Sequence, residues 1–300
     1  MAVNATSSRG RLHDGEVIAD FAVVGTFAAI DLIARQDVDN GNAVAFLLLG
    51  GVAGGGGVGY LLSSKYEVDA GAAHATTLGM SLGFANAALL IEPTGWTRSE
   101  SVLNLLFLGS AAGATGGFIY GQAAKLTSGQ SLFVANLTLL GITTAALGAI
   151  TASSDGDFGN VENGALAIGL DGGAIAGALI APSLDWSPRR AKVVMASTVI
   201  GAFVGGMFAG LLANPNDGET RSDNGEVVTA AMTAGLWGGF GLGIMMTKQS
   251  APDPRFMQPA AAPVAARTAK VSASATPTST AFAPWVGREG QFGLMAGGAF

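Results

Sequence analysis

Cysteine is absent from the chain, and charge is scarce: only 12% of the 300 residues are Asp, Glu, Lys or Arg. Without a thiol, the chain has no disulfide scaffold, no thiolate catalysis and no cysteine-ligated metal site. The 15 basic residues are scattered among 21 acidic ones, so no basic stripe is present to neutralise a phosphate backbone. These absences argue against nucleic acid as a partner.

Signatures of catalysis are also missing. The sequence contains no HExxH motif and no GxSxG nucleophile elbow, and its two histidines are far apart. The glycine run from Gly54 to Gly57 lacks the preceding strand that a phosphate-binding loop requires. An enzyme is therefore the least supported class, and no cofactor is implied.

Apolar residues and glycine are abundant instead. The mean hydropathy is +0.45, and the 46 glycines are about twice the usual share of roughly 7%. The apolar residues gather in eight stretches of about 20 residues, the length that a helix needs to cross a hydrocarbon core of about 30 Å. These stretches are Val17–Ala34, Ala43–Leu62, Ala70–Ile91, Val102–Ala124, Leu132–Thr151, Ala165–Ala181, Val193–Ala213 and Val227–Met246.

This pattern predicts an all-α fold, a polytopic membrane bundle of about eight antiparallel helices packed through Gly and Ala and arranged as repeated hairpins. The alternative is a soluble protein with eight buried core helices. Eight successive helices without a polar face would leave such a protein little surface to meet water.

Glycine spacing favours helices over strands. Within several stretches glycine recurs every four residues, which places it on one face of a helix, whereas a strand would show a period of two. A row of such small residues lets a neighbouring backbone approach closely in lipid. We therefore predict helix packing through Gly109, Gly113, Gly117 and Gly121, through Gly235, Gly239 and Gly243, and through the series Gly51, Gly55, Gly59 and Gly169, Gly173, Gly177.

The stretches resemble one another, which suggests internal repetition. Polar pairs precede a glycine by about ten residues at Gly15-Glu16, Gly41-Asn42 and Gly225-Glu226. Two further helices are introduced by similar segments, Gly95-Trp96-Thr97-Arg98 and Asp185-Trp186-Ser187-Pro188-Arg189. Residues 15–248 thus resemble uncharacterised bacterial cell-envelope proteins built from Gly-zipper helical repeats. The resemblance implies a membrane location and no active site.

Composition divides the chain into four parts. A polar N-terminal segment (1–14) precedes the helical membrane domain with its internal repeats (15–248). Residues 249–283 are rich in Ala, Pro, Ser and Thr, which is typical of a linker that cannot bury a core. Residues 284–300 form a short segment with glycine and aromatics, which could dock on the bundle or a partner or remain a free tail.

Loop charge is consistent with eight crossings. If the chain changes side after each span, one side receives Arg9, Arg11, Lys65, Lys125, Arg189, Arg190, Lys192 and Lys248. The other side receives only Arg35, Arg98 and Arg221, together with most of the acidic loop residues. By the positive-inside rule, the first side, which holds both termini, is the cytoplasmic one in an inner membrane.

Ionisable residues inside the spans are the candidate functional residues, because a charge in hydrocarbon costs at least ~2.5 kcal/mol. They are Asp171, Asp20, Asp31 and His74. Asp171 lies mid-span among glycines that could admit water or another helix. Asp31 has Arg35 one turn later, suited to an ion pair, and Asp20 lies near the polar start of its span. His74 could take part in a proton relay or simply be hydrogen-bonded.

Two further sets of polar residues have a structural and a functional interpretation. Asn86, Asn104 and Asn136 are expected to supply hydrogen bonds between helices. The loop residues Asp155, Asp157 and Glu162 offer oxygen ligands for calcium, but the twelve-residue EF-hand order is absent and a solvated acidic turn is the simpler interpretation.

The sequence therefore predicts a membrane structural or channel-like component, with the lipid bilayer and further copies of itself as partners. A second hypothesis is a transporter of an ion or small solute that uses Asp171 and Asp20. A third is a soluble helical repeat scaffold, which extraction without detergent would reveal.

Overall fold

The computed structural model describes residues 5–95, 98–152, 160–212, 221–248, 281–286 and 292–297. Within these ranges the chain forms eight long α-helices, each long and apolar enough to cross a membrane. This confirms the predicted helical bundle and is compatible with a membrane protein. The helices are α1 (Ala5–Gln36), α2 (Gly41–Lys65), α3 (Ala70–Thr94), α4 (Ser99–Ala123), α5 (Ser128–Ala152), α6 (Asn160–Ile180), α7 (Pro188–Leu212) and α8 (Arg221–Met246), with a 3-10 turn η1 (Ala181–Ser183) after α6.

Short polar residues define where the helices begin and end. The Asn40 carboxamide oxygen accepts a hydrogen bond from the backbone N–H of Asn42 at 2.9 Å and so caps α2. At α5 the capping is reciprocal, since the Gln130 N–H donates to Thr127 Oγ1 and the Thr127 N–H donates to Gln130 Oε1. Gly95 ends α3 with a φ of 65°, a conformation that favours glycine.

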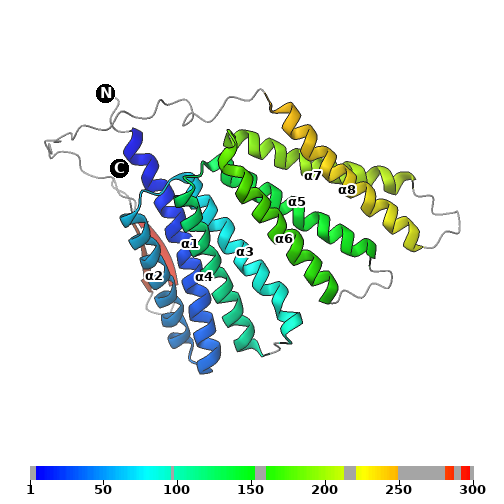
Figure 1. The fold of residues 1–300 in the computed structure, drawn as a ribbon. Helices are drawn as coiled ribbons and strands as arrows, with labels where there is room; N and C mark the ends of the chain where they lie inside the picture. The colour runs from blue at the N-terminus through cyan, green and yellow to red at the C-terminus, as the bar shows by residue number, and fades with distance from the viewer. Residues whose placement is uncertain are drawn as a thin grey trace. The chain divides into compact units, whose positions relative to one another are not determined.

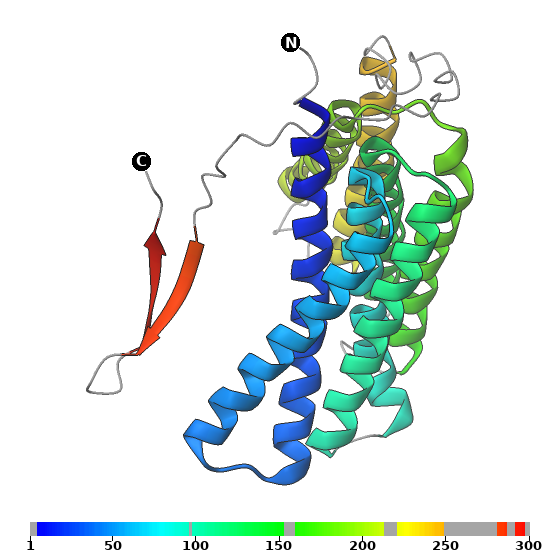
Figure 2. The same ribbon diagram turned by 90° about the vertical axis from the view of Figure 1, so that its left-hand side faces the viewer.

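Consecutive helices pair as four antiparallel hairpins, α1–α2, α3–α4, α5–α6 and α7–α8. They follow one another in this order across Figure 1. The two helices of a hairpin cross obliquely, as α1 and α2 do in Figure 2. The connections within and between hairpins are short wherever the structure describes them, which keeps sequential helices adjacent.

The hairpins stack by one rule. Each later hairpin packs both of its helices on the odd-numbered helix of the hairpin before it: α3 and α4 on α1, α5 and α6 on α3, and α7 and α8 on α5. Apolar clusters fill these junctions. Val17, Phe21 and Val24 of α1 are buried beneath Ala114 and Phe118 of α4.

Residues 281–286 and 292–297 belong to a second unit, distinct from the helical one. This second unit contains a two-stranded antiparallel sheet of β1 (Ala281–Val286) and β2 (Phe292–Gly297), in which Ala281 pairs with Gly297 and Val286 with Phe292. The aromatic and β-branched residues of 281–286 suit a strand.

Candidate functional site

Asp20 is buried in α1 and faces α3. Its Oδ2 accepts a hydrogen bond from the Thr77 hydroxyl at 2.7 Å. This bond joins the first two hairpins, because Thr77 lies on α3. The position near the start of the span agrees with the sequence, but the partner, 57 residues away, was not predicted.

Asp31 is also buried, and its partner is local. Arg35 Nε lies 2.9 Å from Asp31 Oδ2, one helical turn further along α1. The other carboxylate oxygen, Oδ1, is buried and has no hydrogen-bond partner among the described residues. The guanidinium group, which is itself half-exposed, compensates the charge at the end of the span.

His74 lies one turn inside α3, and its Nδ1 is 2.9 Å from the Ser128 hydroxyl at the start of α5. Either atom can donate, depending on the tautomer. The contact pairs the imidazole with a hydroxyl, so it supplies a tie between hairpins and does not form the histidine–aspartate pair of a relay.

Asp171 lies in the middle of α6 and is exposed on the surface of the bundle. Its Oδ1 accepts a hydrogen bond from the Asn86 carboxamide of α3 at 2.7 Å. Near the end of α3, Glu92 accepts a second hydrogen bond, from Asn163 of α6. Asn136 likewise donates to the Ala191 carbonyl of α7. Asn86 and Asn136 thus serve the interhelical role expected of them.

The structure does not bring together Asp20 and Asp171, which are hydrogen-bonded to neutral side chains. Their partners, Thr77 and Asn86, are nine residues apart on α3, which places them on opposite faces of that helix and roughly 13 Å apart along its axis. The described residues contain no cluster of three or more His, Asp or Glu side chains that could hold a metal ion. The predicted calcium ligands Asp155 and Asp157 lie outside the described residues, as does the side chain of Glu162.

The Asp171–Asn86 bond has a counterpart one hairpin later. Trp237 of α8 donates its indole N–H to the hydroxyl of Thr144 on α5 at 3.2 Å. Both bonds join the odd helix of one hairpin to the even helix of the next. In addition, the hydroxyls of Thr151 on α5 and Thr229 on α8 are hydrogen-bonded to each other. This bond resembles the one between Glu92 of α3 and Asn163 of α6, which also lies near the ends of its helices. The polar side chains inside the spans therefore connect hairpins to one another.

Glycine backbones form the contact inside each hairpin. A Cβ added to Gly113 would overlap the carbonyl oxygen of Gly79, and one added to Gly79 would overlap the carbonyl oxygen of Gly113. A larger residue at either position would force the two helices apart. The same mutual approach occurs in every hairpin, between Gly25 and Gly51, Gly83 and Gly109, Gly141 and Gly169, and Gly201 and Gly235.

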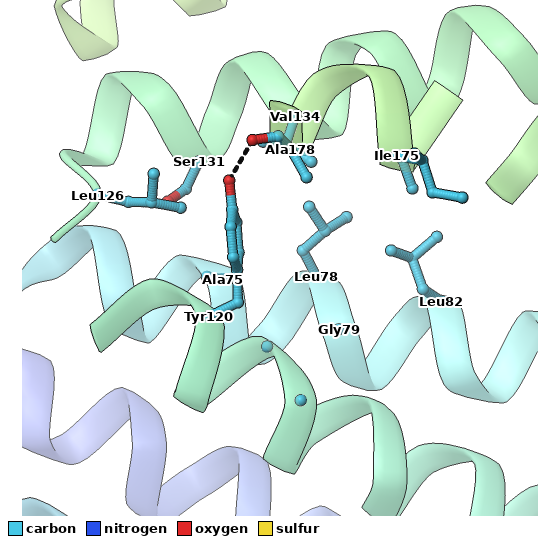
Figure 3. Close-up of a pocket in the computed structure, with 13 residues that line it drawn as sticks. Ala75, Leu78, Gly79, Leu82, Tyr120, Leu126, Ser131, Val134, Ile175 and Ala178 are labelled. Carbon is cyan, nitrogen blue, oxygen red and sulfur yellow. Dashed lines mark hydrogen bonds between the residues drawn. The ribbon is translucent and has the colours of Figure 1, made fainter. Parts of the chain in front are cut away.

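A cavity of about 230 Å³ lies between the second and third hairpins. Figure 3 shows side chains of α3, among them Leu78 and Leu82, facing Ile175 of α6 across it. Its two hydroxyls are already engaged: Tyr120 donates to the Ala178 carbonyl at 2.5 Å, and Ser131 donates to the Gly71 carbonyl at 2.7 Å. The lining is otherwise apolar, so the cavity suits hydrocarbon and offers no ligands to an ion.

Comparison of the chain with protein-family models, curated proteins and solved structures finds no match.

Proposed function

We propose that this protein is a structural component of a membrane, a scaffold of glycine-packed hairpins that holds its shape within the bilayer and has no enzymatic role. The observation that carries the proposal is the repeated hairpin contact, in which glycine backbones touch at corresponding points of all four hairpins. Glycine in a helix interior costs about 1 kcal/mol relative to alanine. Eight such positions are consistent with selection for close packing.

Internal duplication accounts for this regularity. The first glycine of each contact, Gly25, Gly83, Gly141 and Gly201, recurs at intervals of 58, 58 and 60 residues. The hairpin is then the repeating unit, and each glycine series acts as a glycine zipper. This agrees with the resemblance to bacterial cell-envelope proteins with Gly-zipper repeats, and it favours a cell-envelope membrane as the location. Loop charge favours a cytoplasmic position for both termini.

The engagement of the intramembrane polar groups supports a scaffold over a transporter. Asp20 and Asp171 each accept a hydrogen bond from α3, on opposite faces of that helix. Asp31 is paired with Arg35. A carrier of ions needs polar groups that converge on one path through the bilayer. The arrangement observed ties helices together, which is the usual role of isolated polar side chains in helix packing.

Reconstitution into lipid vesicles tests the proposal. Vesicles that contain the protein should take up protons, sodium ions and potassium ions no faster than vesicles without protein, and Asp20→Asn together with Asp171→Asn should change nothing. The protein should also remain with the membrane after washing at high pH and require detergent for extraction. Carboxylate-dependent flux would establish the transporter instead, and extraction without detergent would establish a soluble scaffold.

A further inference from the structure

The four hairpins can be placed in register by their glycine contacts. Gly25, Gly83, Gly141 and Gly201 on the odd helices each face the backbone of a glycine on the even helix, namely Gly51, Gly109, Gly169 and Gly235. In all four hairpins, a Cβ added to the odd-helix glycine would also lie against the Cα of the residue four positions after the even-helix glycine. These eight residues, the crossing glycines, define corresponding positions along the chain.

The odd helices share a receiving face, on which the next hairpin packs. It consists of the residues eight, four and one positions before the crossing glycine. In α1 these are Val17, Phe21 and Val24, and in α5 they are Phe133, Leu137 and Leu140. Five of these six residues are buried, and Leu137 is partly buried. On α3 the corresponding residues, Ala75, Gly79 and Leu82, line the cavity between the second and third hairpins. The receiving face is therefore closely packed on α1 and α5 and borders a cavity on α3.

The even helices share a docking face, made of the residues one, five and nine positions after the crossing glycine. In α4 these are Ser110, Ala114 and Phe118, all buried. In α8 they are Leu236, Phe240 and Ile244, which pack against the clusters that contain the receiving face of α5. In α6 they are Leu170, Ala174 and Ala178, and the two alanines line the cavity opposite the receiving face of α3. Each docking face thus lies opposite the receiving face of the preceding hairpin.

Both ends of the stack leave one of these faces uncovered. On α7 the receiving face is Val193, Ser197 and Ile200. Ser197 packs against Gly243 of α8 in the same hairpin, whereas Ile200 is 61% exposed although the corresponding Leu140 is 1% exposed. On α2 the docking face is Val52, Gly56 and Tyr60, and Tyr60 is 62% exposed although the corresponding Phe118 is 4% exposed. Within the described residues, no hairpin follows the last one and none precedes the first.

We propose that the docking face of α2 packs on the receiving face of α7 in a second copy of this chain. The proposal rests on the scaffold function and names its partner. The interface continues the one that already joins hairpins within the chain, so Val52 would lie near Ile200, and Tyr60 near Val193, as Leu236 clusters with Leu140. Because the two faces differ, the contact is head-to-tail and generates a ring or a filament.

The polar positions at the two ends suit this contact. The residues that correspond to Asn86 and Asp171 are Val204 on α7 and Ala53 on α2, so neither end leaves an unpaired polar group there. The Ser197 hydroxyl donates to the Val194 carbonyl within α7. Exposed apolar residues on a membrane protein ordinarily face lipid, and these two faces are distinguished from the rest by their correspondence to buried positions inside the chain.

The absence of cysteine permits a direct test by cross-linking in the membrane. One preparation carries Ile200→Cys and another carries Val52→Cys, and the two full-length proteins are co-reconstituted and treated with a short bismaleimide. A covalent dimer should form in the mixture, and its amount should be several-fold larger than the amount formed by either variant alone. A chain with both Leu140→Cys and Leu236→Cys is the positive control, since these residues cluster within one molecule. A mixture of Ile200→Cys with Phe46→Cys, which lies elsewhere on α2, is the negative control.

The pattern of cross-linked dimers distinguishes a head-to-tail contact, a symmetric contact and contact with lipid alone. A dimer specific to the Ile200 and Val52 variants supports the head-to-tail contact. A dimer of Ile200→Cys alone would overturn it in favour of a symmetric pair, and absence of dimers with a positive intramolecular control would show that lipid covers both faces. If the Leu140 and Leu236 control itself failed, the stacking of hairpins would be wrong, and the scaffold proposal would fall with it.

Discussion

Asp171 illustrates how an acidic side chain can join two helices at the surface of a helical bundle. Its carboxylate is held by the Asn86 carboxamide at 2.7 Å, and the corresponding pair one hairpin later is Trp237 and Thr144. The residue types differ, but each pair places a donor opposite an acceptor. At the residue scale, these positions form a hydrogen bond between hairpins at two of the three junctions, and a carboxylate is one of several groups that can accept it. At the first junction the corresponding residues are Ala28 and Ala111, which form no such bond.

A double-mutant cycle on Asn86→Ala and Asp171→Ala measures this bond. We expect a coupling free energy of about 0.6 kcal/mol, the average for hydrogen bonds between membrane helices. Asp171→Asn should retain most of the stability, because its carboxamide oxygen can still accept from Asn86. The measurement is unfolding in mixed micelles with a graded denaturant. Strictly additive losses would show that the two side chains do not interact.

Sequence reasoning identified some of these residues and missed their partners for a physical reason. The pairing of Asp31 with Arg35 depends only on the four-residue spacing of a helix, so it is visible in the sequence. The bond between Thr77 and Asp20 spans 57 residues and depends on which hairpins touch. The corresponding spacing of 58 residues between crossing glycines is the signal that could have located such contacts.

At the scale of the helix pair, glycine determines how closely two backbones approach. In α4, Gly113 faces the Gly79 carbonyl, whereas a Cβ on Gly116 would meet no atom within 4 Å. The two glycines are three residues apart on the same helix but differ in what they face. The four-residue period distinguishes them in the sequence too, because Gly109, Gly113 and Gly117 belong to the series and Gly116 does not.

Gly113→Leu should therefore destabilise the protein by about 1 to 3 kcal/mol, because the added side chain forces α3 and α4 apart. Gly116→Leu is the matched control, because a Cβ at this exposed position meets no atom within 4 Å, and it should leave stability unchanged or raise it by up to about 1 kcal/mol through better helix propensity. Thermal unfolding of the purified protein in one detergent measures both changes. Equal effects of the two substitutions would contradict the close contact at Gly113.

At the scale of the whole helical unit, apolar length predicted the number of helices, and glycine spacing predicted that neighbouring helices pack closely. The stacking order was not predicted. Which face of α1 receives the next hairpin depends on how Val17, Phe21 and Val24 fit against Ala114 and Phe118, and this is a matter of shape between distant segments. Apolar residues occur on every side of these helices, so hydrophobicity alone does not mark the buried side.

If all eight helices cross the bilayer, successive loops lie on alternate sides of it. Asp37 lies between α1 and α2, after one helix, and Lys125 lies between α4 and α5, after four. An odd and an even number of crossings place these two residues on opposite sides of the bilayer. Both lie in short connections outside the helices and are exposed, so a thiol at either position can be reached from the aqueous phase.

Single substitutions Asp37→Cys and Lys125→Cys therefore test the topology in a chain with no other thiol. A membrane-impermeant maleimide applied to sealed membranes of one orientation should label one variant and leave the other unlabelled until the membranes are opened. By the positive-inside rule, Lys125 should be on the cytoplasmic side, since the loops on the same side as Lys125 carry most of the lysine and arginine. Labelling of both variants from one side would mean that an odd number of the helices between them fail to cross. In that case the hairpins could not stand as antiparallel pairs within the bilayer, whatever their apolar length.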